Sequence, residues 1–453
     1  MLCPSVKSQR SFHSLSATYL RNRILGAFRS STDPFVAAAA SSIPADIVFA
    51  NPTLQWLASV VANLADPSAV SNSSKTHAEE IEDMVAMYTK DLPTVKGKRP
   101  IDPSEGLVVV LTGSTGALGS HLLADLLADE RVRKVYTLDR AEHVQERQQL
   151  AFEDRLLPLE MLRSDKLRAL TVNAGRADLG LDTATLAEIK SNVTHVIHNA
   201  WKVDFNLSLS SFESNIASTR RLIDIVISCE NAVRFFFTSS IASTISSDTK
   251  HPVPERVNED PNTSAKFGYG ASKYTAERIV AEAARAWSSS DWVPIIVKSS
   301  VAIGALPIWE EEVSWIPMDV TSASIVDALF SCSEKTPPEV INIVHPRPVS
   351  GQALFEDMKD ALERDRLKFV SYEEWLAKIE ALAAASKTEQ DLQRIPALKT
   401  MGFLRALNTA SGTLTFDTTN AQTLSQTLKN AKPLGKEDAA RWVRYWRSRG
   451  MLD

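Results

Sequence analysis

The sequence has little of what marks several large classes of protein. Its 453 residues include only three cysteines, far apart, and eight histidines without metal-ligand spacing, so neither a disulfide framework nor a metal site is expected. No apolar run approaches the ~20 residues of a membrane-spanning helix. The net charge of −5 gives no sign of a nucleic-acid or membrane partner. We therefore expect a globular protein of a reducing compartment, the cytoplasm.

Acidic residues are also absent from the first 32 positions, which are rich in serine. Five basic residues lie there: Lys7, Arg10, Arg21, Arg23 and Arg29. This composition is typical of a mitochondrial presequence. A second interpretation of the same stretch, as part of a helical domain, is given below and accounts for the basic residues better.

Two polar, turn-rich stretches, residues 66–76 and 94–105, divide the first part of the chain. Between them, EEIEDMVAMYTKDL (79–92) has the spacing of an amphipathic helix. The predicted apolar face of this helix consists of Ile81, Met84, Val85 and Tyr88. The region before residue 107 is therefore predicted to be mainly helical.

From residue 107 onward, β-rich apolar runs alternate with helical stretches. LVVVLT (107–112) is apolar throughout, as a strand buried on both faces requires. The later predicted strands are 134–139, 167–173, 194–200 and 233–240. Such alternation predicts an α/β fold with a Rossmann-type, doubly wound parallel sheet. Beyond about residue 350 the strand signal fades, which predicts a smaller, mainly helical C-terminal domain.

A glycine-rich segment, TGSTGALG (112–119), follows the first predicted strand and opens a predicted helix. Glycines at this position allow a tight turn and a close approach of backbone N–H groups to a pyrophosphate. A tight turn without a ligand is the alternative, but the strand–loop–helix context is that of a dinucleotide site. The expected loop contacts are Gly113, Ser114, Thr115, Gly116, Leu118 and Gly119.

The end of the second predicted strand bears on the choice of cofactor. Asp139 could accept a hydrogen bond from a ribose 2′-hydroxyl, which favours NAD. Arg140, with Arg147 behind it, could bind a 2′-phosphate, which favours NADP. Because arginine forms charge-assisted hydrogen bonds with phosphate, we favour NADPH over the alternative of a solvated Arg140.

The heptapeptide GYGASKY (268–274) places Tyr269 and Lys273 on one face of a predicted helix. A free phenol has a pKa of ~10, and a nearby ammonium group favours the phenolate and makes proton transfer accessible. The strand end FFFTSSIAS supplies a hydroxyl to hold a substrate oxygen, and we choose Ser240 over its neighbour Ser239. The alternative is a packed tyrosine beside a solvated lysine.

These three motifs follow one another in the order of a tyrosine-dependent short-chain dehydrogenase of the extended type. In that arrangement hydride passes from a nicotinamide to a carbonyl carbon. Ser240 would hydrogen-bond the developing oxyanion and Tyr269 would protonate it. Lys273 would tune Tyr269 and hold the nicotinamide ribose.

Four stretches together resemble a narrower family: HNAWKVDFNLSLSSFESNI (198–216), FTSSIAS (237–243), GYGASKYTAERIV (268–280) and WIPMDVTSASIVDAL (315–329). They are similar to the thioester reductase domain that ends fungal adenylate-forming reductases, aminoadipate reductases and carboxylic acid reductases. The resemblance extends over residues 107–453. It implies that an acyl group, held as a thioester on a carrier protein, is reduced with NADPH and released as an aldehyde or an alcohol.

The same resemblance implies further cofactor contacts. Asn199, Ala200 and Trp201 would lie along the cofactor and the path of the acyl group. Asp178 and Leu179 match a short acidic pair that contacts the adenine end. The carrier that presents the acyl group would belong to the same chain or to another one.

The N-terminal stretch resembles part of a phosphopantetheine carrier domain. SFHSLSATYLRNRI (11–24) is similar to the second carrier helix, and VFANPTLQWLASVV (48–61) to the last part. The resemblance implies 4′-phosphopantetheine on Ser14, although His13 replaces the usual aspartate. Because only 13 residues precede Ser14, we interpret the region as a carrier fragment.

The expected domain organisation combines these observations. It comprises a carrier fragment (11–65), a linker with one helix (66–106), an NADP-binding Rossmann reductase domain (107–345) and a mainly helical substrate-binding part (346–453). Tryptophans of the last part are expected to pack its helices: Trp375, Trp442 and Trp446.

One departure from the family pattern follows the Tyr–Lys helix. There the family has a strand with an arginine and glycines before a W-V-P segment, whereas AERIVAEAARAWSSSDWVP (276–294) reaches this segment directly. We interpret this as the omission of a strand and its loop, which puts the activity in question. In the alternative, the apolar segment VPIIVKSSVAIG (293–304) is itself the sixth strand.

Three functions are therefore open at this stage. The leading one is NADPH-dependent reductive release of a carrier-bound acyl thioester. The second is an extended dehydrogenase or epimerase that acts on a free small molecule, which leaves the carrier-like segment unexplained. The third is a non-catalytic remnant that binds nucleotide only, which the omitted strand favours.

Overall fold

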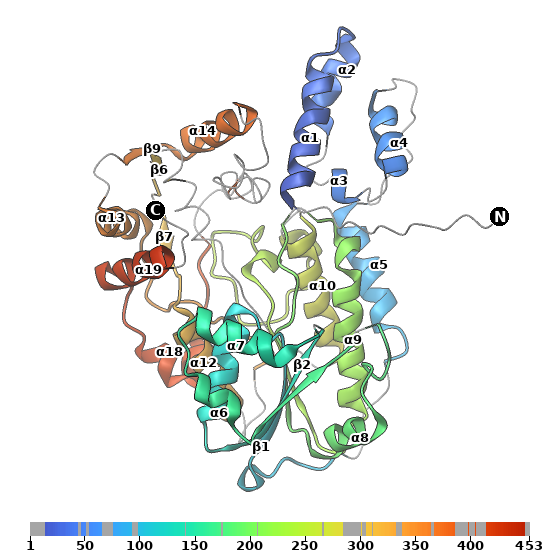
Figure 1. The fold of residues 1–453 in the computed structure, drawn as a ribbon, viewed down its shortest axis with the longest axis vertical. Coiled ribbons are helices and arrows are strands. Elements are labelled where there is room, and N and C mark those ends of the chain that lie inside the picture. The colour runs from blue at the N-terminus through green and yellow to red at the C-terminus, as the bar shows by residue number, and fades with distance from the viewer. Residues whose placement is uncertain are drawn as a thin grey trace, which may run out of the picture.

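The structure is a computed structural model of the 453-residue chain. It describes residues 14–43, 47–50, 54–65, 76–92, 98–140, 142–173, 175–205, 207–264, 267–283, 300, 305–309, 311–331, 338–363, 367–385, 397, 404 and 414–448. These form an N-terminal helical unit, a central α/β layer and a C-terminal cap (Figure 1). None of the described helices has the length and apolar character needed to cross a membrane.

A five-stranded parallel sheet forms the centre of the molecule and confirms the predicted Rossmann-type α/β fold. Its strands are β1 (Leu107–Thr112), β2 (Val132–Asp139), β3 (Leu167–Thr171), β4 (His195–His198) and β5 (Arg234–Phe237). The spatial order is β3-β2-β1-β4-β5, so the chain reverses direction across the sheet between β1 and β4. Ligands of doubly wound folds bind at such a reversal, outside the carboxyl ends of the strands.

Both faces of β1 are buried, as its uniformly apolar sequence predicts. Leu107, Val109 and Leu111 pack towards helices α6 (Ala117–Ala128) and α12 (Met318–Ser331). Val108 and Val110 pack on the opposite face, towards α8 (Thr183–Asn192) and α9 (Glu213–Ile227). A further helix, α7 (Val144–Asp154), follows β2 and adds Phe152 to the first of these clusters.

The helix expected in the linker, α5 (His77–Thr89), packs directly on the central layer. Its buried Ile81 and Val85 belong to one hydrophobic cluster with residues of α9 and of α10 (Gly268–Ala283), and its Met84 and Tyr88 pack against that cluster. This is the apolar face that the sequence predicts. The N-terminus of α5 carries a capping box in which the Thr76 and Glu79 side chains each bind the other's backbone N–H.

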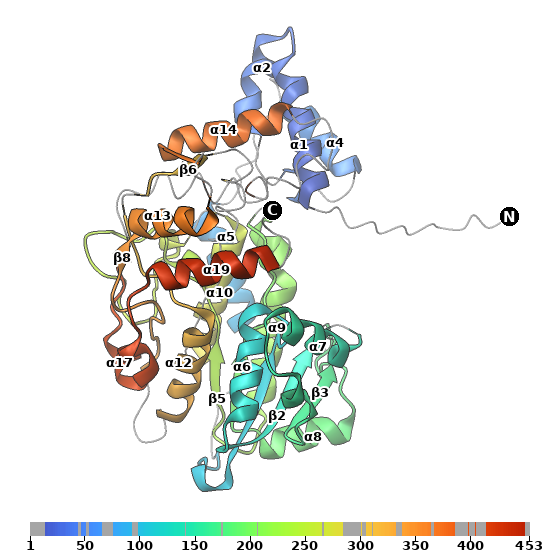
Figure 2. The same cartoon turned by 60° about the vertical axis from the view of Figure 1, so that its left-hand side comes forward.

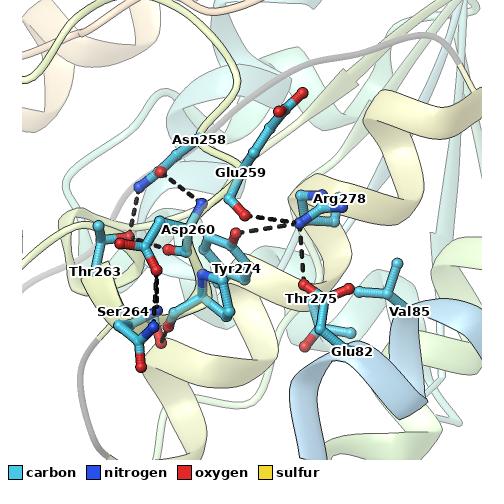
Figure 3. Close-up of polar contacts among 12 residues, drawn as sticks. Glu82, Val85, Asn258, Glu259, Asp260, Thr263, Ser264, Tyr274, Thr275 and Arg278 are labelled. Atoms are coloured by element: carbon cyan, nitrogen blue, oxygen red, sulfur yellow. Dashed lines mark hydrogen bonds and ion pairs between the residues drawn. The ribbon is translucent and has the colours of Figure 1, made fainter. Parts of the chain in front are cut away.

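A polar network joins the same two helices to a loop (Figure 3). The Arg278 guanidinium of α10 lies 3.2 Å from Glu82 of α5 and donates to the Glu259 carbonyl, also at 3.2 Å. It further donates to the Tyr274 hydroxyl at 3.3 Å. At the start of α5, His77 hydrogen-bonds Ser264 of the same loop region at 3.0 Å. Helix α5 is therefore fastened to α10 by apolar and by polar contacts.

The C-terminal cap has a separate hydrophobic core (Figure 2). Its helices are α13 (Gly351–Leu362), α14 (Tyr372–Ala385) and α19 (Lys436–Ser448). Two short strand pairs complete it: β6 (Ala305–Pro307) with β9 (Lys368–Val370), and β7 (Glu312–Val313) with β8 (Val349–Ser350). Trp375 and Trp446 are buried in this core and Trp442 packs against it, as the sequence predicts.

The chain passes between the cap and the central layer more than once. Strands β6 and β7 precede residue 345 yet contribute Leu306 and Val313 to the core of the cap. Helices α17 (Thr419–Leu424) and α18 (Gln426–Asn430) follow it, yet pack on α12 of the central layer. The single boundary predicted at residue 345 therefore does not separate the two cores in space, because each core draws on segments from both sides of it.

A buried carboxylate joins the crossing segments. Glu255 accepts hydrogen bonds from the backbone N–H groups of Asn342, Asn420 and Ala421. The Asn342 side chain in turn donates to the carbonyls of Val253 and Asp417. The loop around residue 255 is thus bound to both the 342 and the 420 regions.

The N-terminal unit has a small core that is separate from the others. It consists of α1 (Ser14–Arg29), α2 (Pro34–Ala39), α3 (Ile47–Ala50) and α4 (Leu54–Ala65). The buried residues of this core are Phe28, Ala40, Ile43, Ile47, Val48 and Leu57. Asp33 caps the N-terminus of α2 by accepting from the Phe35 N–H. Ser14 is the first residue of α1.

The segment in which the omission is predicted, residues 284–304, lies outside the described residues apart from Ser300. The two interpretations of residues 293–304 therefore stay open. In the described part of the chain, β5 is the outermost strand of the sheet on this side.

We predict that Ile81→Ala in α5 destabilises the central layer. Ile81 is fully buried, so the truncation removes packing and leaves a cavity between α5, α9 and α10. The free energy of unfolding, measured with urea, should fall by ~2–4 kcal/mol. Met87→Ala on the same helix is the matched control, because Met87 is 59% exposed. Equal effects of the two variants would contradict the integral role of α5.

Candidate active site

The predicted site residues converge at the carboxyl edge of the sheet. The glycine loop follows β1, the HNAW segment follows β4, and the serine-rich turn follows β5. These three strands are neighbours in the sheet, and the reversal of strand order lies between β1 and β4. Helix α10, which carries Tyr269 and Lys273, packs against the turn after β5. The fold therefore places all three motifs at the position where doubly wound proteins bind their ligands.

The glycine loop is shaped by close backbone contacts. Gly113 has a φ of +74°, and a Cβ there would lie 2.9 Å from the Cα of Ala200. A Cβ on Gly119 would lie 2.0 Å from the Gly113 carbonyl oxygen. Gly116 is exposed and forms the N-cap of α6. The loop thus combines a tight turn with the N-terminal end of a helix, which fits the binding of a pyrophosphate.

Two residues expected in this loop turn their side chains inward. Leu118 is buried in the cluster between the sheet and α6. The Ser114 hydroxyl is fully buried and donates to Asp139 at 2.6 Å. Because both side chains point into the protein, Ser114 and Leu118 could contact a nucleotide only through their backbone atoms. Thr115 is half-buried at the turn itself.

Asp139, the candidate partner of a ribose hydroxyl, braces the glycine loop instead. It is buried at the end of β2, and its carboxylate accepts from Ser114. Gln148 of α7 donates to the Ser114 hydroxyl and to Thr137, both at 2.8 Å. Burial raises the pKa of Asp139, while the Ser114 and Gly113 hydrogen bonds and the positive charge of Arg147 oppose this rise. The carboxylate is thus engaged by the protein's own loop.

Arg140 is exposed and lines a cavity of about 760 Å³ at this end of the sheet. The wall is built by Tyr88, Glu142, Thr171, Val172, Asn173, Gly175, Gly180, Glu213, Ser214, Ala217 and Arg221. Asp178 and Leu179 lie in the loop that borders this cavity but are not part of its wall. Arg176 holds the Asp178 carboxylate at 2.8 Å and lowers its pKa, and the Leu179 side chain is buried beneath the sheet.

The HNAW segment connects the glycine loop to helix α10. The Asn199 side chain points to the Gly113 carbonyl at 3.5 Å, and the Ala200 N–H donates to the Thr112 hydroxyl at 2.9 Å. The Trp201 indole N–H donates to the Ser272 hydroxyl at 3.2 Å. This tryptophan therefore links helix α10 to the segment that follows β4.

His198, which begins this segment, lies below the site. It is buried, and its two ring nitrogens hydrogen-bond the hydroxyls of Thr112, at 2.9 Å, and Thr219, at 3.0 Å. Burial lowers its pKa to about 3, so the ring is neutral at physiological pH. Its role is structural, because both ring nitrogens are engaged by the protein.

Tyr269 lies one residue after a point of close backbone approach. A Cβ on Gly268 would come within 2.2 Å of the Ser208 carbonyl carbon, so only glycine fits at the start of α10. The Tyr269 ring is 1% exposed and packs edge-on against Phe205, with ring centroids 5.1 Å apart, and against Phe212. Ala242 of the turn after β5 belongs to the same cluster.

Lys273 is buried one turn further along α10. Its ammonium group lies 4.5 Å from the Trp201 ring centroid and 4.8 Å from that of Phe237, and it donates to the Thr238 carbonyl. Burial lowers its pKa well below the usual value, and the charge of Glu277 opposes this shift. The aromatic rings and the carbonyl are the groups that stabilise a charge at this depth.

The structure distinguishes between the two candidate serines. Ser239 is fully buried, and its hydroxyl donates to the Glu277 carboxylate. Ser240 lines a cavity of about 680 Å³, and its hydroxyl accepts from the Ala242 N–H at 3.2 Å. It begins the short helix η5 (Ile241–Ser243), which packs against α10. Of the two, Ser240 is therefore the serine that borders an open space.

Glu277 is a component of the site that the sequence argument did not identify. It lies one turn beyond Lys273, borders the same cavity as Ser240, and accepts a hydrogen bond from Ser239, and its carboxyl group is also in hydrogen-bonding contact with Ser243. The Ser243 hydroxyl also donates to the Ser240 carbonyl at 2.7 Å. The available signal was the spacing Tyr269, Lys273, Glu277, which repeats every four residues along one helical face.

The chain also matches a known protein family. The family model NAD_binding_4, described as Male sterility protein, matches residues 111–344, just over half of the chain. The matched region begins within β1 and ends just before the cap helices, and so includes the glycine loop, Ser240, Tyr269 and Lys273.

One curated relative is the adenylate-forming reductase Nps11 of the fungus Serpula lacrymans var. lacrymans (strain S7.9). It is 41% identical, and the match covers 98% of this chain and 45% of the relative. The chain thus spans less than half the length of that protein. The alignment extends over 499 positions, although the chain has only 453 residues, so the relative carries segments within it that this chain lacks.

Solved structures with the same fold include two reductase proteins of peptide and polyketide assembly lines. The terminal R domain of the myxalamid PKS-NRPS pathway has a TM-score of 0.68 at 22% identity, covering 83% of this chain and 99% of that one. A thiolation-reductase di-domain of an archaeal non-ribosomal peptide synthetase has a TM-score of 0.64 at 15% identity, covering 97% and 92%. At these identities the likeness shows the fold alone.

Glu277→Gln is predicted to change the pH dependence of stability. Burial raises the pKa of Glu277 from 4.5 to about 7, so the folded protein keeps a proton that an unfolded chain has released. The resulting stabilisation is complete below about pH 4.5 and is lost as the pH rises through about 7. Glutamine retains an acceptor for Ser239 but does not titrate.

The variant should therefore gain stability over the wild type between pH 5 and pH 8, by on the order of 2 kcal/mol. Urea denaturation of both proteins at the two pH values measures this difference. A difference that does not change with pH would show that Glu277 is ionised throughout.

Proposed function

The chain belongs to the Male sterility protein family of NAD-binding domains, and on that premise we propose that it reduces an acyl thioester with NADPH and releases an aldehyde. The observation that carries this proposal is the meeting of three motifs at one edge of the sheet. The glycine loop, the Ser240 turn and the Tyr269–Lys273 helix follow neighbouring strands or pack on one another. This is the arrangement that carbonyl reduction requires of a short-chain dehydrogenase.

Several features of the site support NADPH as the cofactor. The exposed Gly116 and the positive φ of Gly113 leave backbone N–H groups at the N-terminus of α6 for the pyrophosphate. Asp139 is engaged by Ser114, which takes away the acidic partner that an NAD site offers to the ribose. Arg140 borders the cavity where a 2′-phosphate would lie. When bound, NADPH supplies the hydride for the carbonyl carbon.

The roles of the chain's own residues follow from their positions. Ser240 donates a hydrogen bond to the substrate oxygen, where negative charge develops. The wall of the 680 Å³ cavity that Ser240 borders includes Glu277 but not Tyr269 or Lys273. Tyr269 gives its phenolic proton to that oxygen. Lys273 supplies the nearby positive charge that lowers the cost of forming the phenolate. The hemithioacetal hydroxyl then returns its proton to the Tyr269 phenolate as the C–S bond breaks, which releases the thiolate and yields the aldehyde; a second reduction would yield an alcohol.

A carrier protein is the proposed source of the thioester. Residues 14–65 form a unit with a core of its own, and the fold likeness to a thiolation-reductase di-domain extends over 97% of the chain. Ser14, at the start of α1, is the proposed attachment point of 4′-phosphopantetheine. The carrier would act within the chain or come from another chain.

A second candidate is a remnant that binds nucleotide without turnover. It is favoured by the segments of the Serpula relative that have no counterpart in this chain. We interpret the omission as the loss of a strand and a loop that would lie near the nicotinamide. The glycine loop and the Arg140 cavity would still support cofactor binding in such a remnant.

Tyr269→Phe tests the leading proposal. NADPH oxidation with a panel of acyl-pantetheine thioesters should fall by ~100-fold or more, because the proton donor is removed, while NADPH affinity stays constant. Tyr274→Phe is the matched control, since Tyr274 is a buried tyrosine of the same helix whose hydroxyl binds Arg278.

The outcomes separate the candidates. A large loss in Tyr269→Phe with little loss in Tyr274→Phe supports the thioester reductase. A wild type that binds NADPH but oxidises none of it with any thioester points to the remnant. Turnover that Tyr269→Phe leaves intact contradicts the assigned proton donor.

A further inference from the structure

One residue in the wall of the cavity that Arg140 borders comes from outside the region matched by the family model. Tyr88 belongs to α5, which precedes residue 111, the first position of the family match. It borders the same cavity as Arg140 of the β2 end and Arg221 of α9. In Figure 1, α5 runs beside α9 and α10 although it is separated from them along the chain. The nucleotide end of the site is therefore completed by an upstream helix.

Tyr88 is held in place by α9 from two directions. Its hydroxyl donates to the Glu213 carboxylate at 3.1 Å. Its backbone carbonyl, with that of Lys90, accepts from the Arg220 guanidinium at 3.0 and 2.8 Å. Burial and the Glu213 hydrogen bond raise the pKa of Tyr88, so it remains an uncharged phenol. The ring is thus a positioned, neutral aromatic surface beside the cavity.

The cavity presents charges in addition to this ring. Arg140 and Arg221 contribute guanidinium groups, and Glu142 and Glu213 contribute carboxylates, of which Glu213 is bound by Tyr88. A flat aromatic surface together with two guanidinium groups suits a ligand that combines a π-face with an anion. Adenosine that carries a phosphate on its ribose has this combination.

We propose that Tyr88 stacks on the adenine ring of NADPH, and that Arg140 and Arg221 bind the ribose 2′-phosphate in the same subsite. The proposal rests on the NADPH dependence proposed above. It assigns to the helix before the reductase domain a direct contact with the cofactor. The two halves of the subsite are separable, because stacking acts on adenine and the guanidinium groups act on the phosphate.

Calorimetric binding of 2′,5′-ADP and of 5′-AMP to the full chain tests both halves. Tyr88→Ala should weaken both ligands by ~10-fold, since adenine stacking on an aromatic side chain contributes to each. Tyr88→Phe keeps the ring and should stay within about threefold of the wild type. Arg140→Ala should weaken 2′,5′-ADP and leave 5′-AMP unchanged, because only the first ligand has the 2′-phosphate.

Met87→Ala is the matched control on α5, since Met87 is exposed and should affect neither ligand. Urea denaturation of each variant establishes that it is folded. A folded Tyr88→Ala that binds both ligands as the wild type does would overturn the inference, as would a wild type that binds neither.

Failure of the underlying proposal gives a different result. A wild type that binds 5′-AMP as tightly as 2′,5′-ADP contradicts the preference for NADPH and the role of the two arginines. In that case, weaker binding of 5′-AMP to Tyr88→Ala than to the wild type still supports the stacking contact. Equal binding of 5′-AMP to the two proteins overturns the stacking contact.

Discussion

Helix α10 is covered by protein on nearly every side, and the rest of the site is arranged around this burial. Its first nine residues, from Gly268 to Ala276, are all buried. The turn after β5, the loop at residue 208, α9 and α5 each pack on it. A helix enclosed in this way cannot shift without disturbing all of these contacts, so its polar side chains are held in fixed directions. The buried Lys273 and the half-buried Glu277 are therefore placed by packing.

Lys273 and Glu277 lose much of their contact with water at these positions, and neighbouring groups of the protein replace the interactions that water would make. Lys273 lies against two aromatic rings and donates to a backbone carbonyl. Glu277 accepts a hydrogen bond from Ser239 and contacts the Ser243 hydroxyl. Desolvation moves the pKa of the lysine down and that of the glutamate up, because burial disfavours the charged form of each group. The groups that stabilise these two side chains come from the ends of β4 and β5. They lie close together because β4 and β5 are neighbours in the sheet.

Segments that are far from the site motifs along the chain also contribute to this region. Helix α5 supports α10 through its apolar face, and its Tyr88 borders the same cavity as Arg140. The cap and the central layer exchange segments, and Glu255 binds two of the crossing segments, at residue 342 and at residues 420–421, to its own loop. The described part of the chain is thus one assembly in which a helix between two linker-like stretches carries part of the packing and lines part of a cavity at the edge of the sheet.

The sequence by itself determined the fold class, the positions of the five central strands and the motifs that are proposed to form the site. It could do so because these depend on local patterns: an apolar run for β1, glycine spacing for the loop, and a four-residue interval for Tyr269 and Lys273. Only the tertiary structure decided the rest. It bound Asp139 to the glycine loop, turned Ser239 towards Glu277, and brought Tyr88 to the cavity that Arg140 borders. These outcomes depend on contacts between residues far apart in the chain, and such contacts are set by how helices and strands pack rather than by the spacing of residues along any one of them.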